Sequence, residues 1–273
     1  MVVTKLIGGL GNQMFQYAAG RSLALRQNSD FFIDRKSFDS YKLHEYGLHN
    51  FDLVANDYKS KYFNLISKRN LEAYVEKTFT FDRGVLELKD PVFLDGYWQS
   101  EKYFNDYSVQ IRNDFIIKTK PNSYNQAIAE NVKKSTSVSI HVRRGDYVSN
   151  PDANRFHGTC SLDYYKKSIE YICDVVKKPV EFFIFSDDTE WAKENLNIQG
   201  LKHHFVSNSA STNYEDLRLM ALCKHNIVAN STFSWWGAWL NSFEGKEVVA
   251  PSRWFADDTL SDRDLIPTSW VRI

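Results

Sequence analysis

Three features are scarce in this 273-residue sequence: cysteine, net charge and long apolar runs. The three cysteines, Cys160, Cys173 and Cys223, are widely spaced and form no CxxC pair. This argues against a zinc site or a disulfide framework and favours a reducing compartment. No apolar run approaches membrane-spanning length, and the first residues do not have the pattern of a signal peptide. We therefore expect a cytoplasmic protein. Peripheral membrane association stays open, although no amphipathic basic helix indicates it.

The formal charges cancel, with 34 Lys and Arg residues against 34 Asp and Glu residues. This balance argues against a large nucleic-acid interface and for a small or neutral partner, although cations can still gather in one site. The apolar fraction of 43% is typical of a folded globular protein, and the length allows one large or two small domains. The aromatic fraction of 15% is high, which suits cores and interfaces and also the stacking of sugars or bases.

Apolar segments that alternate with amphipathic helices predict parallel sheets covered by helices. A strand over 2–7 leads into the turn Gly8-Gly9-Leu10-Gly11, a helix and a second strand over 31–34, which is the start of a Rossmann-like half. Residues 36–90 have weak periodicity, so we expect short helices and loops there. Five strand–helix repeats follow from residue 137. We divide the chain into an N-terminal domain, 1–135, and a C-terminal domain, 136–273.

Polar side chains follow three predicted strands of the C-terminal half: His141 to Asp146, Ser186 to Asp188, and Asn230 to Ser234. Parallel strands place these ends at one edge of a sheet, where open α/β sheets bind ligands. Alternation puts His141 and Arg143 on the same face of their strand. Arginines next to the hydroxyls of a helix start suit a diphosphate, and the Asp187 carboxylate can accept hydrogen bonds from a guanine edge. A strand-end ion pair with ordinary helix caps is the structural alternative.

Three other stretches resemble motifs but do not fit them. The first glycine turn is not a dinucleotide fingerprint, because Met14 occupies the third glycine position. Asp262-Arg263-Asp264 spells the DxD pattern of some metal-dependent sugar-nucleotide transferases, but no apolar strand precedes it. His44 and His49 are five residues apart rather than four, so they do not share a helix face as zinc ligands would. We predict no metal site.

Five segments, in order along nearly the whole chain, resemble glycosyltransferase family 11, the α-1,2-fucosyltransferases that use GDP-fucose. They are residues 9–17, 96–104, 141–147 (HVRRGDY), 185–188 (FSDD) and 230–240 (NSTFSWWGAWL). Residues 36–90 take no part in the resemblance. It implies an α/β, GT-B-like fold, in which two Rossmann-like domains face each other across a cleft. The N-terminal domain would bind the acceptor and the C-terminal domain GDP-fucose.

The resemblance further implies inverting, metal-independent transfer of L-fucose to the 2-hydroxyl of a terminal galactoside, as in bacterial O-antigen or polysaccharide biosynthesis. No cofactor is expected; the partners are GDP-fucose and a galactose-terminated glycan. His141 would contact the guanine and Arg143 the β-phosphate, with Arg144 as a supporting cation. The remaining substrate-binding residues would be Asn12, Gln13, Asp187, Ser231, Thr232, Phe233 and Ser234.

Departure of GDP leaves negative charge on its β-phosphate, and without a metal Arg143 must stabilise that charge. The acceptor hydroxyl also needs a base. Asp146 is the first candidate, unless it orients Arg144, and Asp152 is the second. Two other functions stay open: a catalytically silent nucleotide-sugar or glycan-binding protein on the same scaffold, and a metal-dependent transferase that uses Asp262 and Asp264.

Overall fold

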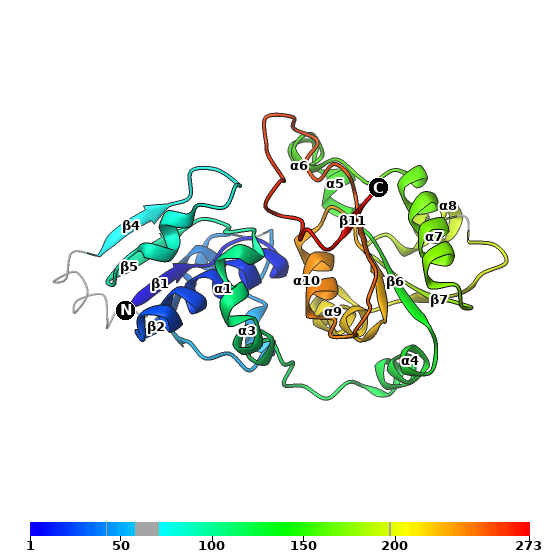
Figure 1. The fold of residues 1–273 in the computed structure, drawn as a ribbon, viewed down its shortest axis with the longest axis horizontal. Helices are drawn as coiled ribbons and strands as arrows, with labels where there is room; N and C mark the ends of the chain where they lie inside the picture. The colour runs from blue at the N-terminus through cyan, green and yellow to red at the C-terminus, as the bar shows by residue number, and fades with distance from the viewer. Residues whose placement is uncertain (42, 58–70, 197) are drawn as a thin grey trace. The chain divides into compact units, whose positions relative to one another are not determined.

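The computed structural model describes residues 1–41, 43–57, 71–196 and 198–273. Its contacts divide the chain into two compact units, which we describe separately (Figure 1). Unit 1 contains Met1–Thr119 and Ser261–Pro267, and unit 2 contains Lys120–Leu260 and Thr268–Ile273. The chain therefore returns to unit 1 after residue 260 and ends in unit 2. None of the helices in the described ranges is long and apolar enough to cross a membrane.

Unit 1 is built on a five-stranded parallel sheet with the strand order β3-β2-β1-β5-β4. Its strands are β1 (Val2–Lys5), β2 (Phe31–Asp34), β3 (Asn56–Asp57), β4 (Glu72–Val75) and β5 (Val92–Asp95). Helix α1 (Leu10–Gln27) connects β1 to β2 and is mostly buried. Gly20 allows this close packing, because a Cβ there would collide with Thr4 and Phe31. The predicted strand–turn–helix–strand start is confirmed.

The region 36–90 contains more structure than its sequence suggested. Short 3₁₀ helices occur at η1 (Lys36–Asp39), η2 (Leu48–Asn50) and η4 (Arg83–Glu87), as expected. Strands β3 and β4 were not predicted. Three of the four β4 side chains are exposed and β3 has two residues, so neither shows an apolar alternation. Residues 58–70 of this region lie outside the described residues. A segmented helical stretch follows β5, with η5 (Glu101–Tyr103), η6 (Asn105–Tyr107) and α3 (Ser108–Asp114).

Unit 2 is built on a six-stranded parallel sheet with the strand order β11-β10-β9-β6-β7-β8. Its strands are β6 (Ser137–Val142), β7 (Glu181–Ser186), β8 (Lys202–Val206), β9 (His225–Ile227), β10 (Val248–Ala250) and β11 (Val271–Arg272). The main covering helices are α7 (Leu162–Val176), α9 (Asn213–Leu222) and α10 (Thr232–Leu240), seen around the sheet in Figure 1. The predicted repeats are confirmed, except that β11, only two residues long, was missed.

The two faces of β6 have different neighbours, which sets the orientation of the site. Val138, Ile140 and Val142 pack in one core cluster with Ile169 and Ile172 of α7. Ser139 and His141 face the other way. The Ser139 hydroxyl accepts a hydrogen bond from Asn226, and the ring centroid of His141 lies 5.7 Å from that of Phe233 in α10. The alternation predicted from the sequence is therefore confirmed.

The boundary between the units differs from the one predicted between residues 135 and 136. Contacts place it between Thr119 and Lys120, because helix α4 (Ser123–Lys134) packs on α9 of unit 2. The side-chain amides of Asn125 in α4 and Asn208, shortly before α9, exchange two hydrogen bonds of 3.0 and 3.1 Å. Helix α4 is therefore part of unit 2.

Candidate functional site

The charged residues that follow β6 meet those that follow β7. Arg143 Nη1 lies 2.8 Å from Asp187 Oδ2, and the backbone N–H of Arg144 donates to Asp187 Oδ1 at 2.8 Å. The side chains of Arg143 and Asp187 are 25% and 24% exposed, so a ligand can reach the pair from solvent. Asp187, predicted to read a guanine edge, thus also orients the arginine that is predicted to bind phosphate.

Gly145 makes this close approach possible. It is the first residue of the short helix α5 (Gly145–Ser149). A Cβ at this position would lie 2.6 Å from Asp187 Oδ2, closer than side-chain carbon and oxygen atoms pack. A side chain in place of Gly145 would therefore have to push the Asp187 carboxylate aside.

Arg144 is anchored away from this pair. Its guanidinium carbon lies 3.7 Å from the ring centroid of Trp191, and its Nε lies 3.4 Å from Asp188 Oδ2. Asp188 also caps helix α8 (Thr189–Asn195) by accepting from the N–H of Trp191. A cation–π contact and an ion pair therefore fix Arg144 on α8. These partners of Arg144 were not predicted from the sequence, although an Asp directly before a helix is the usual signal of a cap.

His141 is 5% exposed and is neutral near pH 7. Burial lowers its pKa to about 4; the Asp187 carboxylate opposes this shift and Arg143 reinforces it. Its Nδ1 is buried without a hydrogen-bond partner among the described residues. A buried polar atom left unpaired costs about 1–3 kcal/mol, so this nitrogen has capacity for a ligand. The guanine contact itself stays a prediction.

The start of α10 presents some of its predicted ligand groups and turns one inward. Thr232 and Phe233 are partly exposed, whereas Ser231, the N-cap, is only 6% exposed. Ser234 is 1% exposed, and its hydroxyl donates to the carbonyls of Ala229 at 3.4 Å and Ser231 at 3.2 Å. Substrate binding by the Ser234 side chain therefore stays a prediction. This hydroxyl satisfies backbone groups where the strand turns into the helix.

Two predicted ligand residues, Gln13 and Asn12, lie at the glycine turn after β1 and differ in burial. Gln13 is fully buried; its amide nitrogen donates to the carbonyls of Gly8 at 2.8 Å and Glu45 at 2.9 Å, and its oxygen accepts from the N–H of Gly47 at 2.9 Å. One amide hydrogen, on Glu45, and the amide oxygen, on Gly47, therefore tie residues 45–47 to the turn, and substrate binding by Gln13 stays a prediction. Asn12 is partly exposed and accepts a hydrogen bond from Gln99 at 3.1 Å, and its contact with the donor stays a prediction.

The two candidate bases lie in consecutive short helices. Asp146 is in α5, and its side chain is outside the part of the chain that the structure describes. Asp152 is in the first turn of α6 (Pro151–His157), where its side chain is exposed. The choice between them stays a prediction.

The DxD stretch belongs to unit 1, where Asp264 is a structural carboxylate. Its Oδ1 lies 2.5 Å from Lys102 Nζ, and its Oδ2 accepts from the N–H of Phe81 at 3.0 Å and lies 3.2 Å from Arg263 Nε. The Asp264 carboxylate, which is 9% exposed, therefore already has two cations and a backbone N–H as partners. Within the described ranges, no cluster of three His, Cys, Asp or Glu side chains is arranged to hold a metal ion.

With this geometry in place, comparison with known proteins identifies the family. The model of glycosyl transferase family 11 matches residues 1–273. The chain belongs to glycosyltransferase family 11. An alpha-1,2-colitosyltransferase of Escherichia coli is 36% identical, over 100% of this chain and 99% of its own length. The O-antigen biosynthesis glycosyltransferase WbnK of Escherichia coli is 35% identical, over 98% and 99%. The human galactoside alpha-(1,2)-fucosyltransferase 1 is 27% identical, over 66% of this chain and 50% of its own.

Solved structures of fucosyltransferases have the same fold as this chain. The fucosyltransferase NodZ from Bradyrhizobium has a TM-score of 0.50 at 13% identity, over 86% of this chain and 91% of its own. Arabidopsis thaliana FUT1 in complex with GDP has a TM-score of 0.51 at 12% identity, over 99% and 75%. Together with two parallel, helix-covered sheets, this likeness confirms the predicted GT-B-like α/β fold.

Proposed function

We propose that this glycosyltransferase moves L-fucose from GDP-fucose to the 2-hydroxyl of a terminal galactoside, with inversion and without a metal. The arginine–carboxylate pair of Arg143 and Asp187, next to the neutral His141, carries this proposal. The names of the relatives support a 1,2-linkage, since one is an alpha-1,2-colitosyltransferase and another a galactoside alpha-(1,2)-fucosyltransferase. The first of these makes a colitosyl donor the second candidate.

Charge on the leaving group decides the mechanism. Cleavage of the bond between the sugar C1 and the β-phosphate oxygen leaves GDP with an additional negative charge. Arg143 would take this charge through paired N–H groups, because its guanidinium is already oriented by Asp187. The start of α10 would add backbone N–H groups and the positive end of the helix dipole at Thr232 and Phe233. Donors fixed in advance in this way can supply the stabilisation that a metal provides in other transferases.

The guanine would lie against His141 and Asp187. Each carboxylate oxygen of Asp187 accepts one contact within the site, from Arg143 or from the N–H of Arg144. Since a carboxylate oxygen has two lone pairs, Asp187 can accept from a guanine edge without releasing Arg143. We assign GDP-sugar binding to unit 2 on this basis, with Asp146 or Asp152 as the base.

The acceptor galactoside is assigned to unit 1. Here Tyr41 and residues 43–49 contribute aromatic rings beside the glycine turn at the carboxyl end of β1. The His44 ring would meet a Cβ on Gly9 at 3.7–3.8 Å, and it lies 6.1 Å from the ring of Tyr41. Gln13 pins this segment to the turn. Partly exposed aromatic rings at the end of a strand offer the apolar surface on which a sugar ring can stack.

The test is a donor and acceptor panel. The purified chain is incubated with GDP-fucose or with a GDP-linked colitosyl donor, and with galactosides that differ in the penultimate sugar. We expect an L-fucosyl product joined to the galactose 2-hydroxyl with inverted anomeric configuration, identified by NMR. A preference for the colitosyl donor would replace the donor sugar in the proposal, and turnover of neither donor with any acceptor would reject it.

A further inference from the structure

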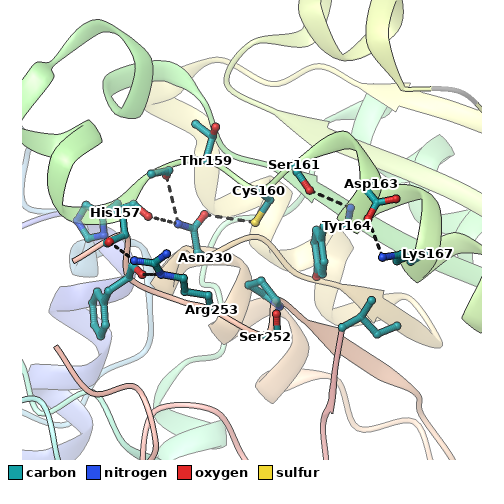
Figure 2. Close-up of a pocket in the computed structure, with 15 residues that line it drawn as sticks. His157, Thr159, Cys160, Ser161, Asp163, Tyr164, Lys167, Asn230, Ser252 and Arg253 are labelled. Carbon is teal, nitrogen blue, oxygen red and sulfur yellow. Dashed lines mark hydrogen bonds and ion pairs between the residues drawn. The ribbon is translucent and has the colours of Figure 1, made fainter. Parts of the chain in front are cut away.

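The cavity of unit 2, about 400 Å³ in volume, offers a ligand little aromatic surface (Figure 2). The rings of Tyr164 and Phe255 in its lining are only 6% and 4% exposed. Figure 2 also shows the ion pair of Asp163 and Lys167, whose charged atoms lie 2.7 Å apart. The carboxyl edge of the unit 1 sheet is different, because aromatic rings and charged groups are partly exposed there.

Residues 96–99 follow β5 at this edge of unit 1, and their backbone is unusual. The φ angle of Trp98 is 56°, in the left-handed region. Asn28 and Lys177 also have positive φ angles, but they are the C-caps of α1 and α7, where this conformation is common. Trp98 does not end a helix. A strained backbone of this kind persists only where its surroundings hold it, and such residues gather at functional sites.

Glu76, the first residue after β4, holds these residues in place. Its Oε2 accepts from the N–H of Tyr97 at 2.6 Å, and its Oε1 accepts from the N–H of Trp98 at 3.0 Å. Gly96 permits this approach, because a Cβ there would collide with the side chain of Glu76. Burial raises the pKa of Glu76, although the two N–H groups oppose the shift. A partly buried carboxylate is therefore used to fix two backbone groups.

The side chain of Trp98 is fixed on the inside of unit 1. It is 0% exposed, and its ring centroid lies 6.3 Å from that of Tyr74 and 5.7 Å from that of Tyr103. Its Nε1 is buried without a hydrogen-bond partner among the described residues. The preceding side chain, that of Tyr97, stays partly exposed at the surface.

Tyr97 lies in a group of partly exposed side chains. Its ring stacks on that of Phe79, with centroids 6.1 Å apart and planes 20° apart. Lys5 Nζ, at the end of β1, lies 3.0 Å from Asp95 Oδ2, at the end of β5, and the two side chains are 32% and 36% exposed. Burial and the Glu76 carboxylate raise the pKa of the Tyr97 hydroxyl and Lys5 lowers it, because these charges are close to the ring.

This combination of an aromatic stack and an ion pair suits a pyranose ring. The C–H face of a sugar packs on an aromatic ring. The ammonium of Lys5 donates hydrogen bonds and the carboxylate of Asp95 accepts them, so the pair can bind two adjacent hydroxyls of the sugar.

The group adjoins the part of unit 1 to which the galactose is assigned. Gln99 Nε2 donates to Asn12 Oδ1 at 3.1 Å and ties the loop after β5 to the glycine turn after β1. The ring of His44 packs against Gly9 in this turn. Since an extended chain spans at most about 3.6 Å per residue, Lys5 lies within about 14 Å of Gly9. Both places are therefore within reach of one short oligosaccharide.

We propose that residues 96–99 belong to a second acceptor subsite of unit 1, in which Tyr97 and the pair of Lys5 and Asp95 bind the sugar unit next to the terminal galactose. Glu76 is a positioning residue, because it acts on the sugar through Tyr97. This inference rests on the proposed function. It requires that a galactose-terminated disaccharide binds more tightly than methyl β-galactoside, and that the gain depends on the ring of Tyr97.

Removal of the ring tests the subsite. Tyr97→Ala removes it, and Tyr97→Phe, which keeps the ring, is the matched control. In Tyr97→Ala we expect the KM for lactose or N-acetyllactosamine to rise about five- to tenfold, the loss expected for one aromatic contact and one hydrogen bond. Tyr97→Phe should keep most of the gain. The KM for GDP-fucose and for methyl β-galactoside should change little in Tyr97→Ala.

Glu76→Gln tests the positioning role. The amide has the size of the carboxylate, but its NH₂ group faces a backbone N–H, so one of the two hydrogen bonds is lost. We expect the KM for the disaccharides to rise several-fold with little change in kcat. In a Tyr97→Ala background Glu76→Gln should cause no further rise. A lower melting temperature without a change in this KM would overturn the positioning role.

A wild-type KM for both disaccharides in Tyr97→Ala would overturn the subsite. So would a wild-type protein that has the same KM for methyl β-galactoside and the disaccharides, or a rise in the KM for GDP-fucose in Tyr97→Ala, which would assign the ring to the donor.

Failure of the proposed function is a separate result, in which the wild-type protein releases no GDP from GDP-fucose with any of these acceptors. Saturation-transfer NMR with lactose, without donor, then decides about the subsite. Transfer to the glucose unit that is lost in Tyr97→Ala would support it. Absence of this transfer in the wild type, or equal transfer in the two proteins, would overturn it.

Discussion

Replacement of Gly145 by alanine adds one methyl group where the loop after β6 meets the end of β7. The new Cβ would lie 2.6 Å from Asp187 Oδ2 and 3.2 Å from its Cγ. Ordinary contact begins at 3.4 Å, so the oxygen must move by about 0.8 Å, the difference between 3.4 and 2.6 Å. The backbone of Gly145 is not in the left-handed region, so alanine causes no strain there. The methyl group acts on the carboxylate alone.

The displaced carboxylate cannot keep both of its contacts. Asp187 is held by Arg143 on one oxygen and by the N–H of Arg144 on the other, both at 2.8 Å. A shift approaching 1 Å in a catalytic group can cost on the order of 100-fold in rate. We therefore expect the kcat of Gly145→Ala to fall about 10- to 100-fold, equivalent to about 1.4–2.8 kcal/mol.

The assay is release of GDP from GDP-fucose at saturating donor and galactoside, with thermal unfolding followed by circular dichroism to verify the fold. A double-mutant cycle isolates the cause. In an Asp187→Ala background the methyl group of Gly145→Ala has room, so we expect it to have almost no further effect. An equal loss of kcat in both backgrounds would show that the methyl group does not act through Asp187, as would a wild-type kcat for Gly145→Ala.

Three further outcomes follow from the site. Arg143→Ala should lose at least ~3 kcal/mol of transition-state stabilisation. Arg143→Lys should lose less, because lysine keeps the charge but not the paired donors. Near-normal turnover by the alanine variant would contradict the proposed role of Arg143. His141 has a folded pKa of about 4 against 6.5 when unfolded, so its contribution to stability is complete above pH 6.5 and is lost as the pH falls towards 4. Urea unfolding at pH 7 and 4.5 should show this loss, up to about 3 kcal/mol, and a His141→Phe variant should lack it. Gln13→Ala should lower the free energy of unfolding by about 2–4 kcal/mol, because it leaves three backbone groups without their partner. A decrease of less than about 0.5 kcal/mol would show that these hydrogen bonds do not stabilise the fold.

The side-chain orientation in strand β6 could be predicted from the sequence. The alternation of residues 138–142 was sufficient to place His141 on the face opposite α7, because the period of two is a property of any strand. The polar residues at three strand ends likewise predicted one edge of a parallel sheet. The pairing of Val142 with Ser186, the last residues of β6 and β7, explains why Arg143 and Asp187, which directly follow them, then meet.

The partners of individual side chains could not be predicted. Gln13 next to a glycine turn has the pattern of a ligand group, but its partners Glu45 and Gly47 are more than 30 residues away in the sequence. In the sequence, Ser234 has the pattern of a phosphate-binding hydroxyl. In the folded chain, the strand–helix turn places two carbonyls within hydrogen-bond distance of this hydroxyl. A tertiary contact satisfies the polar group of Gln13, whereas a local strand–helix turn satisfies that of Ser234.

In the proposed mechanism, Arg143, held by Asp187, stabilises the departing GDP in place of a metal ion. The most direct test is the rate of GDP release from GDP-fucose and a galactoside acceptor, measured in excess EDTA and without it. We predict equal rates in the two conditions. Loss of turnover in EDTA, restored by a divalent cation, would contradict this mechanism.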